Sequence, residues 1–395
     1  MPGPLRVAVI GAGAFGRNHL RVFHDLSQYA EATTPVQLAA VVDANPTTRA
    51  EASARYAIPA YASTEDLLAA DLGLHAATVS VPTIAHAPIA EQLLSAGLDI
   101  LVEKPLTATL AEADHLIALA NRLGRIFAAG HLERFNPAVT AAQARLTRPM
   151  FFEAHRLSIF TPRSLDVDVV LDLMIHDLDI LLTFAQSAVT EVRAVGLPVL
   201  SPKVDIANVR LEFASGAVAN LTASRISTEQ IRKLRLFQPA QYLSLDYARQ
   251  ELLTINVDPA AAAAAAAAGG TALRSHLPTD LSSRPESRSD VAERPASAPA
   301  HAQPQPPHTE AAPRATQPHP SAGLSFTKLD PPRAEPLRLE LEDFLHAVAT
   351  RQPPRVSAQA ARAALAVALE INATIAAHAQ ATGLAPGPVL RNSDE

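Results

Sequence analysis

The sequence predicts an α/β protein in two parts: a parallel sheet covered by helices, then an α+β domain whose open sheet is mostly antiparallel. From residue 5 to about 130, short apolar runs alternate with amphipathic helical patterns. This alternation is typical of the crossover connections between parallel strands. From about 150 onward the apolar runs follow one another with few helices between them, as they do in antiparallel sheets.

In the first part, each expected strand is a short run of apolar residues. These runs are Leu5–Ile10, Gln37–Val42, Ala76–Val81, Asp99–Val102 and Ile126–Ala129. Helical patterns fill the intervals, at residues 14–27, 46–56, 64–71, 84–96 and 109–123.

In the second part, one strand and one helix precede a series of strands. The strand is Met150–Ile159 and the helix is Val169–Phe184. Further strands are expected at Val189–Val195, Val204–Phe213, Ala217–Ser224, Lys233–Phe237 and Tyr242–Asp246. The step Ala214-Ser215-Gly216 is a typical hairpin turn. Two amphipathic helices, Leu337–Thr350 and Ala358–Ala379, are expected near the C-terminus.

A low-complexity segment separates those helices from the strands. Residues 259–336 hold 14 of the 32 prolines together with a polyalanine run, so the segment has too little apolar surface to offset the entropy of ordering it. We expect a disordered insertion at 258–336, with partner binding as the alternative role. The predicted domains are 1–130, and 131–257 plus 337–380, with the C-terminal helices returning to the first domain.

Composition limits the classes of function. The formal net charge is −6, with 33 Lys and Arg against 39 Asp and Glu, which gives no reason to expect nucleic acid or a membrane as partner. The absence of cysteine excludes disulfides, thiolate metal sites and cysteine nucleophiles, and no compact set of metal ligands is expected. The longest uncharged apolar run, Ala260–Ala268, is shorter than a membrane-spanning helix. No secretory signal is evident before the first strand. We expect a cytoplasmic protein.

A glycine-rich turn directly follows the first strand. Gly11, Gly13 and Gly16, with Ala14 and Phe15 between the last two, lie between a strand and a helix. The first glycine permits the tight turn, the second leaves room for a pyrophosphate, and the third lets the helix pack closely. The helix N-terminus attracts the phosphates, so the motif indicates a Rossmann-type dinucleotide site.

An acidic residue, Asp43, closes the second strand. Its carboxylate can accept hydrogen bonds from both ribose hydroxyls and would repel a 2′-phosphate, so NAD is favoured over NADP. Asp43 lies further from the glycines than the usual ~20 residues. We expect the loop at residues 31–35 to supply the excess.

Two more loops face the same crevice, because ligands of an open parallel sheet lie at the carboxyl ends of its strands. Pro82 follows the third expected strand, with His86 one turn into the next helix. Glu103 and Lys104 end the fourth strand, just before a proline. A lysine in that setting is more often a surface residue, but its place at this edge favours a functional role.

In the second part, Asp172 and His176 lie four residues apart on the only substantial helix before the insertion, so they share a helix face. The plain alternative is a helix-stabilising pair. The functional interpretation makes His176 a base near neutral pH and Asp172 a group that orients it or holds substrate.

In this order, the glycine turn, Val81-Pro82…His86, Glu103-Lys104-Pro105 and Asp172…His176 resemble the Gfo/Idh/MocA family of nicotinamide-dependent sugar oxidoreductases. The resemblance covers nearly the whole chain except the insertion. It implies that Lys104, Asp172 and His176 are catalytic, and that Pro82, Glu103 and Lys104 contact the nicotinamide of NAD, with His86 nearby. His176 would take the proton of a secondary alcohol while Lys104 stabilises the developing alkoxide.

Two stretches, at residues 130–137 and 156–172, are similar to a bacterial branch that oxidises UDP-N-acetylglucosamine at C3. In that branch a transaminase aminates the keto product for lipid A. The resemblance implies that Lys104, Asp172 and His176 contact the substrate together with further polar side chains: Arg134, Asn136, Arg156 and Arg163. Guanidinium groups suit a diphosphate, although a salt bridge is an equal alternative for each arginine.

Other functions stay open at this point. A free sugar or inositol is the alternative substrate, and a non-catalytic nucleotide-binding regulator is the alternative class. The family commonly forms dimers or tetramers through the open sheet of the second domain, so a homo-oligomer is expected.

Overall fold

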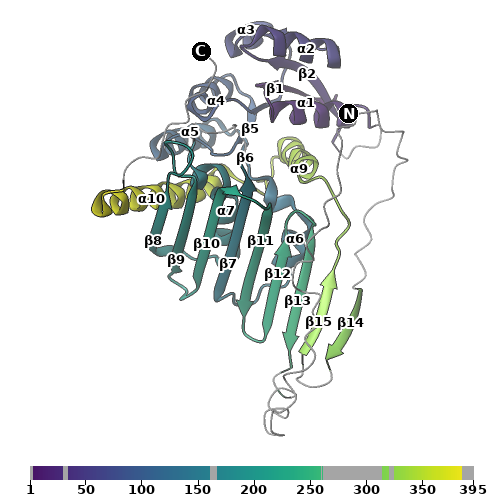
Figure 1. The fold of residues 1–395 in the computed structure, drawn as a ribbon. Helices are drawn as coiled ribbons and strands as arrows, with labels where there is room; N and C mark the ends of the chain where they lie inside the picture. The colour runs from purple at the N-terminus through teal and green to yellow at the C-terminus, as the bar shows by residue number, and fades with distance from the viewer. Residues whose placement is uncertain are drawn as a thin grey trace, which may run out of the picture.

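The computed structural model describes residues 3–29, 34–160, 167–258, 260, 314–319 and 324–384. The chain forms two sheets, one above the other in Figure 1. The first is six-stranded and parallel, with strand order β3-β2-β1-β4-β5-β6. The second is nine-stranded and mostly antiparallel, which confirms the predicted fold class.

The first sheet has the strand order of the doubly wound dinucleotide-binding fold. Its strands are β1 (Leu5–Ile10), β2 (Val36–Val42), β3 (Ala60–Tyr61), β4 (Ala76–Val79), β5 (Asp99–Glu103) and β6 (Phe127–Gly130). Its helices are α1 (Gly16–Ser27), α2 (Pro46–Tyr56), α3 (Thr64–Ala69), α4 (His86–Ser95) and α5 (Leu110–Leu123), with a 3₁₀ turn η1 (Thr83–Ala85). The expected strands and helices are therefore present, with ends shifted by one or two residues, and β3 is an additional two-residue strand.

Local sequence explains where several of these helices begin. Asn45 caps α2 by accepting the backbone N–H groups of residues 47 and 48, and Pro46 occupies the first helical position. Thr109 and Glu112 form a reciprocal capping box at the start of α5. The loops that precede these helices are therefore fixed at the carboxyl edge of the sheet.

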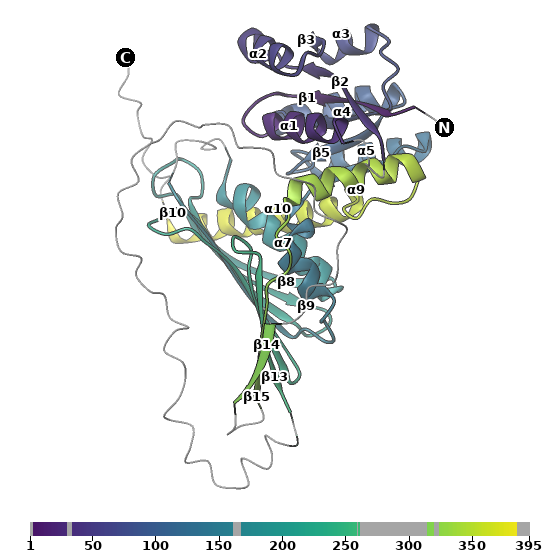
Figure 2. The ribbon, with the colours of Figure 1, turned by 90° about the vertical axis from the view of Figure 1, so that its right-hand side faces the viewer.

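The second sheet has the order β14-β15-β13-β12-β11-β7-β10-β9-β8. Its strands are β7 (Phe151–Ile159), β8 (Val189–Leu197), β9 (Ile206–Phe213), β10 (Val218–Ser227), β11 (Ile231–Gln238), β12 (Gln241–Asp246), β13 (Glu251–Val257), β14 (Arg314–His319) and β15 (Leu324–Leu329). Only β7 and β10 pair in parallel. Figure 2 shows this sheet nearly edge-on, with α7 (Ile175–Ala185) against one face.

The structure corrects the expected limits of the insertion. Residues 314–319 and 324–329 are strands, and β15 pairs antiparallel with β13 from Leu252 to Val257. The folded second domain therefore extends into the segment predicted to be disordered. Residues 261–313, where most of that prediction falls, lie outside the described residues.

The C-terminal helices α9 (Pro336–Thr350) and α10 (Ala358–Thr382) return to the first domain. Leu341 and Phe344 of α9 are buried in the same cluster as α1 and β1. One end of α10 is buried beside α5, and its Ile371 and Ile375 belong to the core of the second domain. By length and composition α10 could cross a membrane, with a mean hydropathy of 1.4 over 18 residues. Its buried face instead makes it a core helix that joins the two domains.

Shorter helical turns complete the second domain: η2 (Leu132–Phe135), α6 (Pro137–Gln143) and η3 (Val170–Met174). The last is a π-helical turn that runs directly into α7. The sequence predicted one continuous helix here and no helix at α6. π-Helical turns often occur at functional sites.

Candidate functional site

The glycine turn after β1 is shaped by contacts with neighbouring backbone. Gly11 has φ +90°, and a Cβ there would lie 2.5 Å from the carbonyl oxygen of Ser80. A Cβ on Gly16 would lie 1.8 Å from the carbonyl oxygen of Gly11. Both positions therefore require glycine if the turn is to pack between β1, α1 and the loop after β4.

Gly13 differs, because a Cβ there would meet nothing within 4 Å. The space above it is open, and Ala14 and Phe15 beside it are exposed. Helix α1 begins directly after this opening, with no side-chain cap and no acidic residue in its first turn. Its N-terminal N–H groups and partial positive charge suit a pyrophosphate, so the residues present fit a bound dinucleotide.

Asp43 follows β2, next to the glycine turn. Its Oδ2 accepts the N–H of Ala12 at 2.7 Å and its Oδ1 accepts the N–H of Asn45 at 2.8 Å. The carboxylate therefore ties the end of β2 to the turn. That Asp43 also recognises the cofactor's ribose stays a prediction.

Two predicted residues stand at the loops after β4 and β5. The ring of His86 is buried, with Nδ1 2.9 Å from the carbonyl oxygen of Pro105 and Nε2 2.9 Å from that of Val81. Burial lowers the pKa of His86. The imidazole therefore lies between the two loops, and as a neutral ring it donates its single N–H to one of these two carbonyl oxygens. Pro82 directly precedes η1.

Glu103 ends β5 and is buried. Its Oε1 lies 3.0 Å from Nε2 of His19 on α1. A Cβ on Gly130 of β6 would lie 2.7 Å from the carboxylate atoms, so the absence of a side chain at Gly130 gives Glu103 its place. The carboxylate is accordingly fixed under the edge where the three loops meet.

Lys104 and Asp172 connect the two domains. The Lys104 Nζ donates to the backbone oxygen of Asp172 at 2.6 Å and to its Oδ1 at 3.2 Å. Their side chains keep 20% and 25% of their exposure, so solvent or a ligand can reach both groups. Two residues predicted from opposite halves of the sequence are therefore in direct contact.

His176 lies at the start of α7, four residues after Asp172. Its side chain is partly buried and its Nδ1 is buried with no hydrogen-bond partner in the described part of the chain. Burial, followed by the positive charges of Lys104 and Arg156, lowers the pKa of His176 well below its usual value. The imidazole is therefore neutral at physiological pH and able to accept a proton.

A second histidine, which sequence reasoning did not select, stands beside it. His131 follows β6 and its ring meets that of His176 edge-to-face, with centroids 6.4 Å apart. It is 1% exposed, and within the described residues neither ring nitrogen has a partner. Its position just after a strand at the carboxyl edge of the sheet is the signal that could have found it.

The predicted diphosphate ligands Arg134 and Arg156 are already paired. Arg134 donates to both carboxylate oxygens of Asp179 at 2.7 Å. Arg156 is 3% exposed, donates to Asp177 at 2.7 and 3.0 Å, and contacts Glu133 at 3.2 Å. These are the salt bridges that the sequence left as the alternative.

Asn136 has a structural place as well. Its Oδ1 accepts the N–H of Ala138 at the start of α6, and its Nδ2 donates to Glu133 and to the backbone oxygen of Tyr247. It is 2% exposed, so in this conformation it offers little to a ligand.

Arg163 lies outside the described residues. Across the described ranges, no group of three or more His, Asp or Glu is arranged to hold a metal ion.

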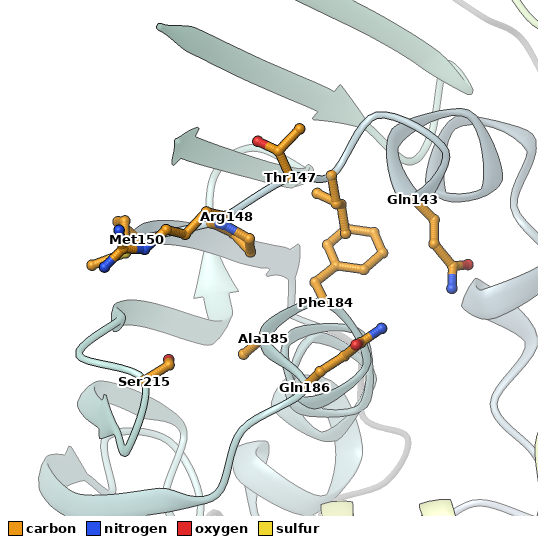
Figure 3. A pocket seen from close by; sticks show the side chains of 10 residues that line it. Gln143, Thr147, Arg148, Met150, Phe184, Ala185, Gln186 and Ser215 are labelled. Carbon is orange, nitrogen blue, oxygen red and sulfur yellow. The ribbon is translucent and has the colours of Figure 1, made fainter. Parts of the chain in front are cut away.

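A separate cavity of about 290 Å³ lies at the far end of α7 (Figure 3). Phe184, Met150 and Gln143 line it, and none of the predicted site residues does. The contact between Lys104 and Asp172 is therefore separate from this cavity.

Comparison with known proteins gives matches in both halves of the chain. A family model described as an oxidoreductase family with an NAD-binding Rossmann fold matches residues 5–131. The model of the GFO/IDH/MocA C-terminal domain matches residues 138–237.

Among curated proteins, the UDP-N-acetylglucosamine 3-dehydrogenase of Acidithiobacillus ferrooxidans is 39% identical over 249 residues, which is 63% of this chain and 76% of that protein. An inositol 2-dehydrogenase of Corynebacterium glutamicum is 34% identical over 140 residues, 35% of this chain and 39% of that one.

Solved structures agree. The structure of the Acidithiobacillus enzyme has a TM-score of 0.75 at 31% identity, covering 96% of this chain and 100% of that chain. An Agrobacterium radiobacter oxidoreductase solved with NAD⁺ has a TM-score of 0.70 at 14% identity, covering 94% and 96%, which shows a shared fold.

Proposed function

Because the chain belongs to the Gfo/Idh/MocA family of NAD-binding oxidoreductases, we propose that it oxidises the C3 hydroxyl of UDP-N-acetylglucosamine to a ketone, with NAD as cofactor. The observation that carries the proposal is the contact of Lys104 with Asp172 beside a neutral His176. The 39% identity to a UDP-N-acetylglucosamine 3-dehydrogenase supports the choice of substrate.

The residues of the junction suit alcohol oxidation. A hydroxyl is a very weak acid, so its proton must leave as the carbon is oxidised. His176 accepts that proton at its imidazole, which its environment keeps neutral. Lys104, held by Asp172, donates to the substrate oxygen and stabilises the negative charge that develops there. When bound, NAD supplies the acceptor for the hydride from the sugar carbon.

Asp172 acts as a positioning and substrate-binding group. Its backbone oxygen already accepts a hydrogen bond from Nζ of Lys104 at 2.6 Å. The more distant Oδ1, at 3.2 Å, is the weaker contact and is able to exchange for a sugar hydroxyl. The π-helical turn in which Asp172 lies brings this group to the lysine.

The test is NADH formation, followed by absorbance at 340 nm, with a panel of UDP-N-acetylglucosamine, UDP-glucose, glucose and myo-inositol. We expect saturable NADH formation with UDP-N-acetylglucosamine and a 3-keto product by mass spectrometry. Turnover only with the free sugar or inositol would establish the alternative substrate. If the wild type forms no more NADH than Lys104→Met with any of these compounds, the result would favour a nucleotide-binding regulator.

We also propose that a PLP-dependent aminotransferase consumes the product, because a 3-keto sugar is a substrate for amination. The branch resemblance points to 3-amino sugars of lipid A, made in the cytoplasm. Adding a candidate aminotransferase and glutamate to the assay tests this: we expect a UDP-3-amino sugar and sustained NADH formation, and an unchanged keto product would argue against the coupling.

A homo-oligomer is the remaining proposal, and the open face of the second sheet supports it. A row of apolar side chains crosses five strands in register, namely Phe151, Phe237, Tyr242, Ile255 and Phe326. Neighbouring rings in it have centroids 5.5 and 4.9 Å apart, and Phe237 is 39% exposed. Light scattering should show a dimer or tetramer that Phe237→Glu dissociates; a monomeric wild type would refute it.

A further inference from the structure

Two arginines beside α7, Arg134 and Arg156, already have carboxylate partners that neutralise their charges. Arg134 uses Nε and Nη2 on Asp179. Arg156 uses Nε and Nη2 on Asp177 and Nη1 on Glu133. A diphosphate at this place is therefore better neutralised by a cation that has no carboxylate partner.

Arg232, on β11, is such a cation. Its Cα is paired with that of Arg156 across β7 and β11. Along β11 the buried side chains are those of Leu234, Leu236 and Gln238, and alternation places Arg232 on the same face. That face is the one that carries Arg156 and packs against α7.

The guanidinium of Arg232 is partly buried and makes no hydrogen bond or ion pair within the described residues. The two carboxylates whose charges act on it, Glu133 and Asp177, are bonded to Arg156. Burial, followed by the charge of Arg156, lowers the pKa of Arg232. Its charge also contributes to lowering the pKa of His176.

A partly buried charge without a direct partner costs free energy, and an anion at this place would offset that cost. Phosphate oxygens accept hydrogen bonds from a planar guanidinium in bidentate fashion. In the proposed substrate the diphosphate is attached at C1 and the reacting carbon is C3, so its anion site must lie apart from the reacting hydroxyl.

We propose that Arg232 binds the diphosphate of the nucleotide-sugar substrate, beside the Arg156 ion pairs and on the sheet face that carries the catalytic helix. This inference rests on the proposed UDP-sugar activity, and it assigns the anion contact to a residue that the sequence motifs did not indicate.

The experiment compares the wild type with Arg232→Met, Arg232→Lys and the control Arg235→Met. Arg235 lies on the same strand but on the opposite face, paired with Glu153 at 3.1 Å. UDP binding is measured by calorimetry, NADH binding by fluorescence, and KM and kcat with UDP-N-acetylglucosamine.

For Arg232→Met we expect UDP affinity to fall, and KM to rise, by about 10–100-fold, the usual effect of removing a charge-assisted hydrogen bond. We expect NADH affinity and kcat to stay within about 2-fold, Arg232→Lys to be intermediate, and Arg235→Met to match the wild type. Retained NADH binding also shows that the variant is folded.

Three results would overturn the inference. Unchanged UDP affinity in Arg232→Met would exclude the diphosphate contact. An equal loss of NADH affinity would mean that Arg232 contacts the pyrophosphate of the cofactor instead, or, if Arg232→Lys shows the same loss, that the variants are misfolded. A lower kcat at unchanged KM would indicate action on His176. Failure of the wild type itself to bind UDP or oxidise UDP-sugars would refute the proposed function and this inference together, and is visible without any variant.

Discussion

Replacing Arg156 tests whether this residue stabilises the fold or binds the substrate. Arg156 is 3% exposed, and its three guanidinium nitrogens lie 2.7–3.2 Å from carboxylate oxygens of Asp177 and Glu133. Arg156→Met keeps an unbranched apolar stem but removes the guanidinium, which leaves two buried carboxylates without their cation. We therefore expect the protein to be strongly destabilised.

The size of the effect follows from the geometry. Removing one member of a buried pair costs roughly 3–5 kcal/mol, because the remaining charge stays desolvated. For a domain of 150–250 residues each kcal/mol lowers Tm by roughly 2–4 °C, so Tm should fall by about 6–20 °C. Replacing Asp177 by Asn in the same variant should recover part of this loss, because one stranded carboxylate is removed.

Urea unfolding followed by circular dichroism measures the change, with Cm compared at constant m. The matched control is Arg193→Met, whose guanidinium pairs with Glu191 at 2.6 Å but is 68% exposed. Its unfolding midpoint should be that of the wild type. If Arg156→Met has the unfolding midpoint of the wild type but no longer binds UDP, the arginine binds substrate and the argument from burial is refuted.

Four further outcomes are expected. Lys104→Met should lower kcat by about 10²–10³-fold at unchanged Tm, because the stabilisation of the alkoxide is lost; a kcat near that of the wild type would remove the lysine from the mechanism. Gly13→Val should weaken NADH binding by at least about 10-fold and leave Tm unchanged, because its Cβ enters open space; a fluorescence titration decides this. Because the pKa of His176 is lowered, kcat/KM should stay level as pH falls through 6.5 and decline only below it, and a decline centred above 6.5 would contradict the assignment. Burial opposes ionisation of Asp205, but hydrogen bonds from the Ser201 side chain and backbone lower its pKa to about 2. The stabilising effect of the ionised carboxylate should therefore be complete above pH 4 and disappear as pH falls toward 2. The urea midpoints of Asp205→Asn should lack that pH dependence.

The first domain could be predicted closely because its strands are buried on both faces and appear in the sequence as continuous apolar runs. Leu5–Ile10 matches β1 to the residue. Strand β3 has only two residues, both partly exposed, and so leaves no such run. The glycine turn was also predictable, because the contacts of Gly11 and Gly16 are local consequences of a strand that turns into a helix.

The second domain was harder, because its sheet is completed by strands distant in sequence. β15 pairs with β13 although the paired residues, from Val257 with Leu324 to Leu252 with Leu329, are far apart in sequence. The alternation of apolar and polar residues in Leu324-Ser325-Phe326-Thr327 is the only local sign of this strand. The composition of the surrounding segment, rich in proline and alanine, hides that sign. Pairing with β13 stabilises β15, and this contribution cannot be predicted from the local sequence of either strand.

The arginines near α7 show a different limit. Arg134 and Arg156 were selected because guanidinium groups suit a diphosphate, but their partners Asp179 and Asp177 lie 45 and 21 residues away. Residue type alone cannot tell a guanidinium that is paired with a carboxylate from one that is not. Arg232 has the same chemistry and no motif, and only its place in the sheet distinguishes it.

The ion pairs near α7 also explain how the neutral base His176 is positioned. The segment that carries His176 presents Asp172, Asp177 and Asp179, and each is bonded to a cation from a different element: Lys104 after β5, Arg156 on β7 and Arg134 on η2. The carboxylates tie this segment to three other elements. Burial and then the positive charges of Lys104 and Arg156 lower the pKa of the imidazole. Replacing Arg156, whose ion pairs are buried, should therefore both destabilise the protein and raise the pKa of His176. Stability and the pH profile of catalysis are expected to change together in this variant.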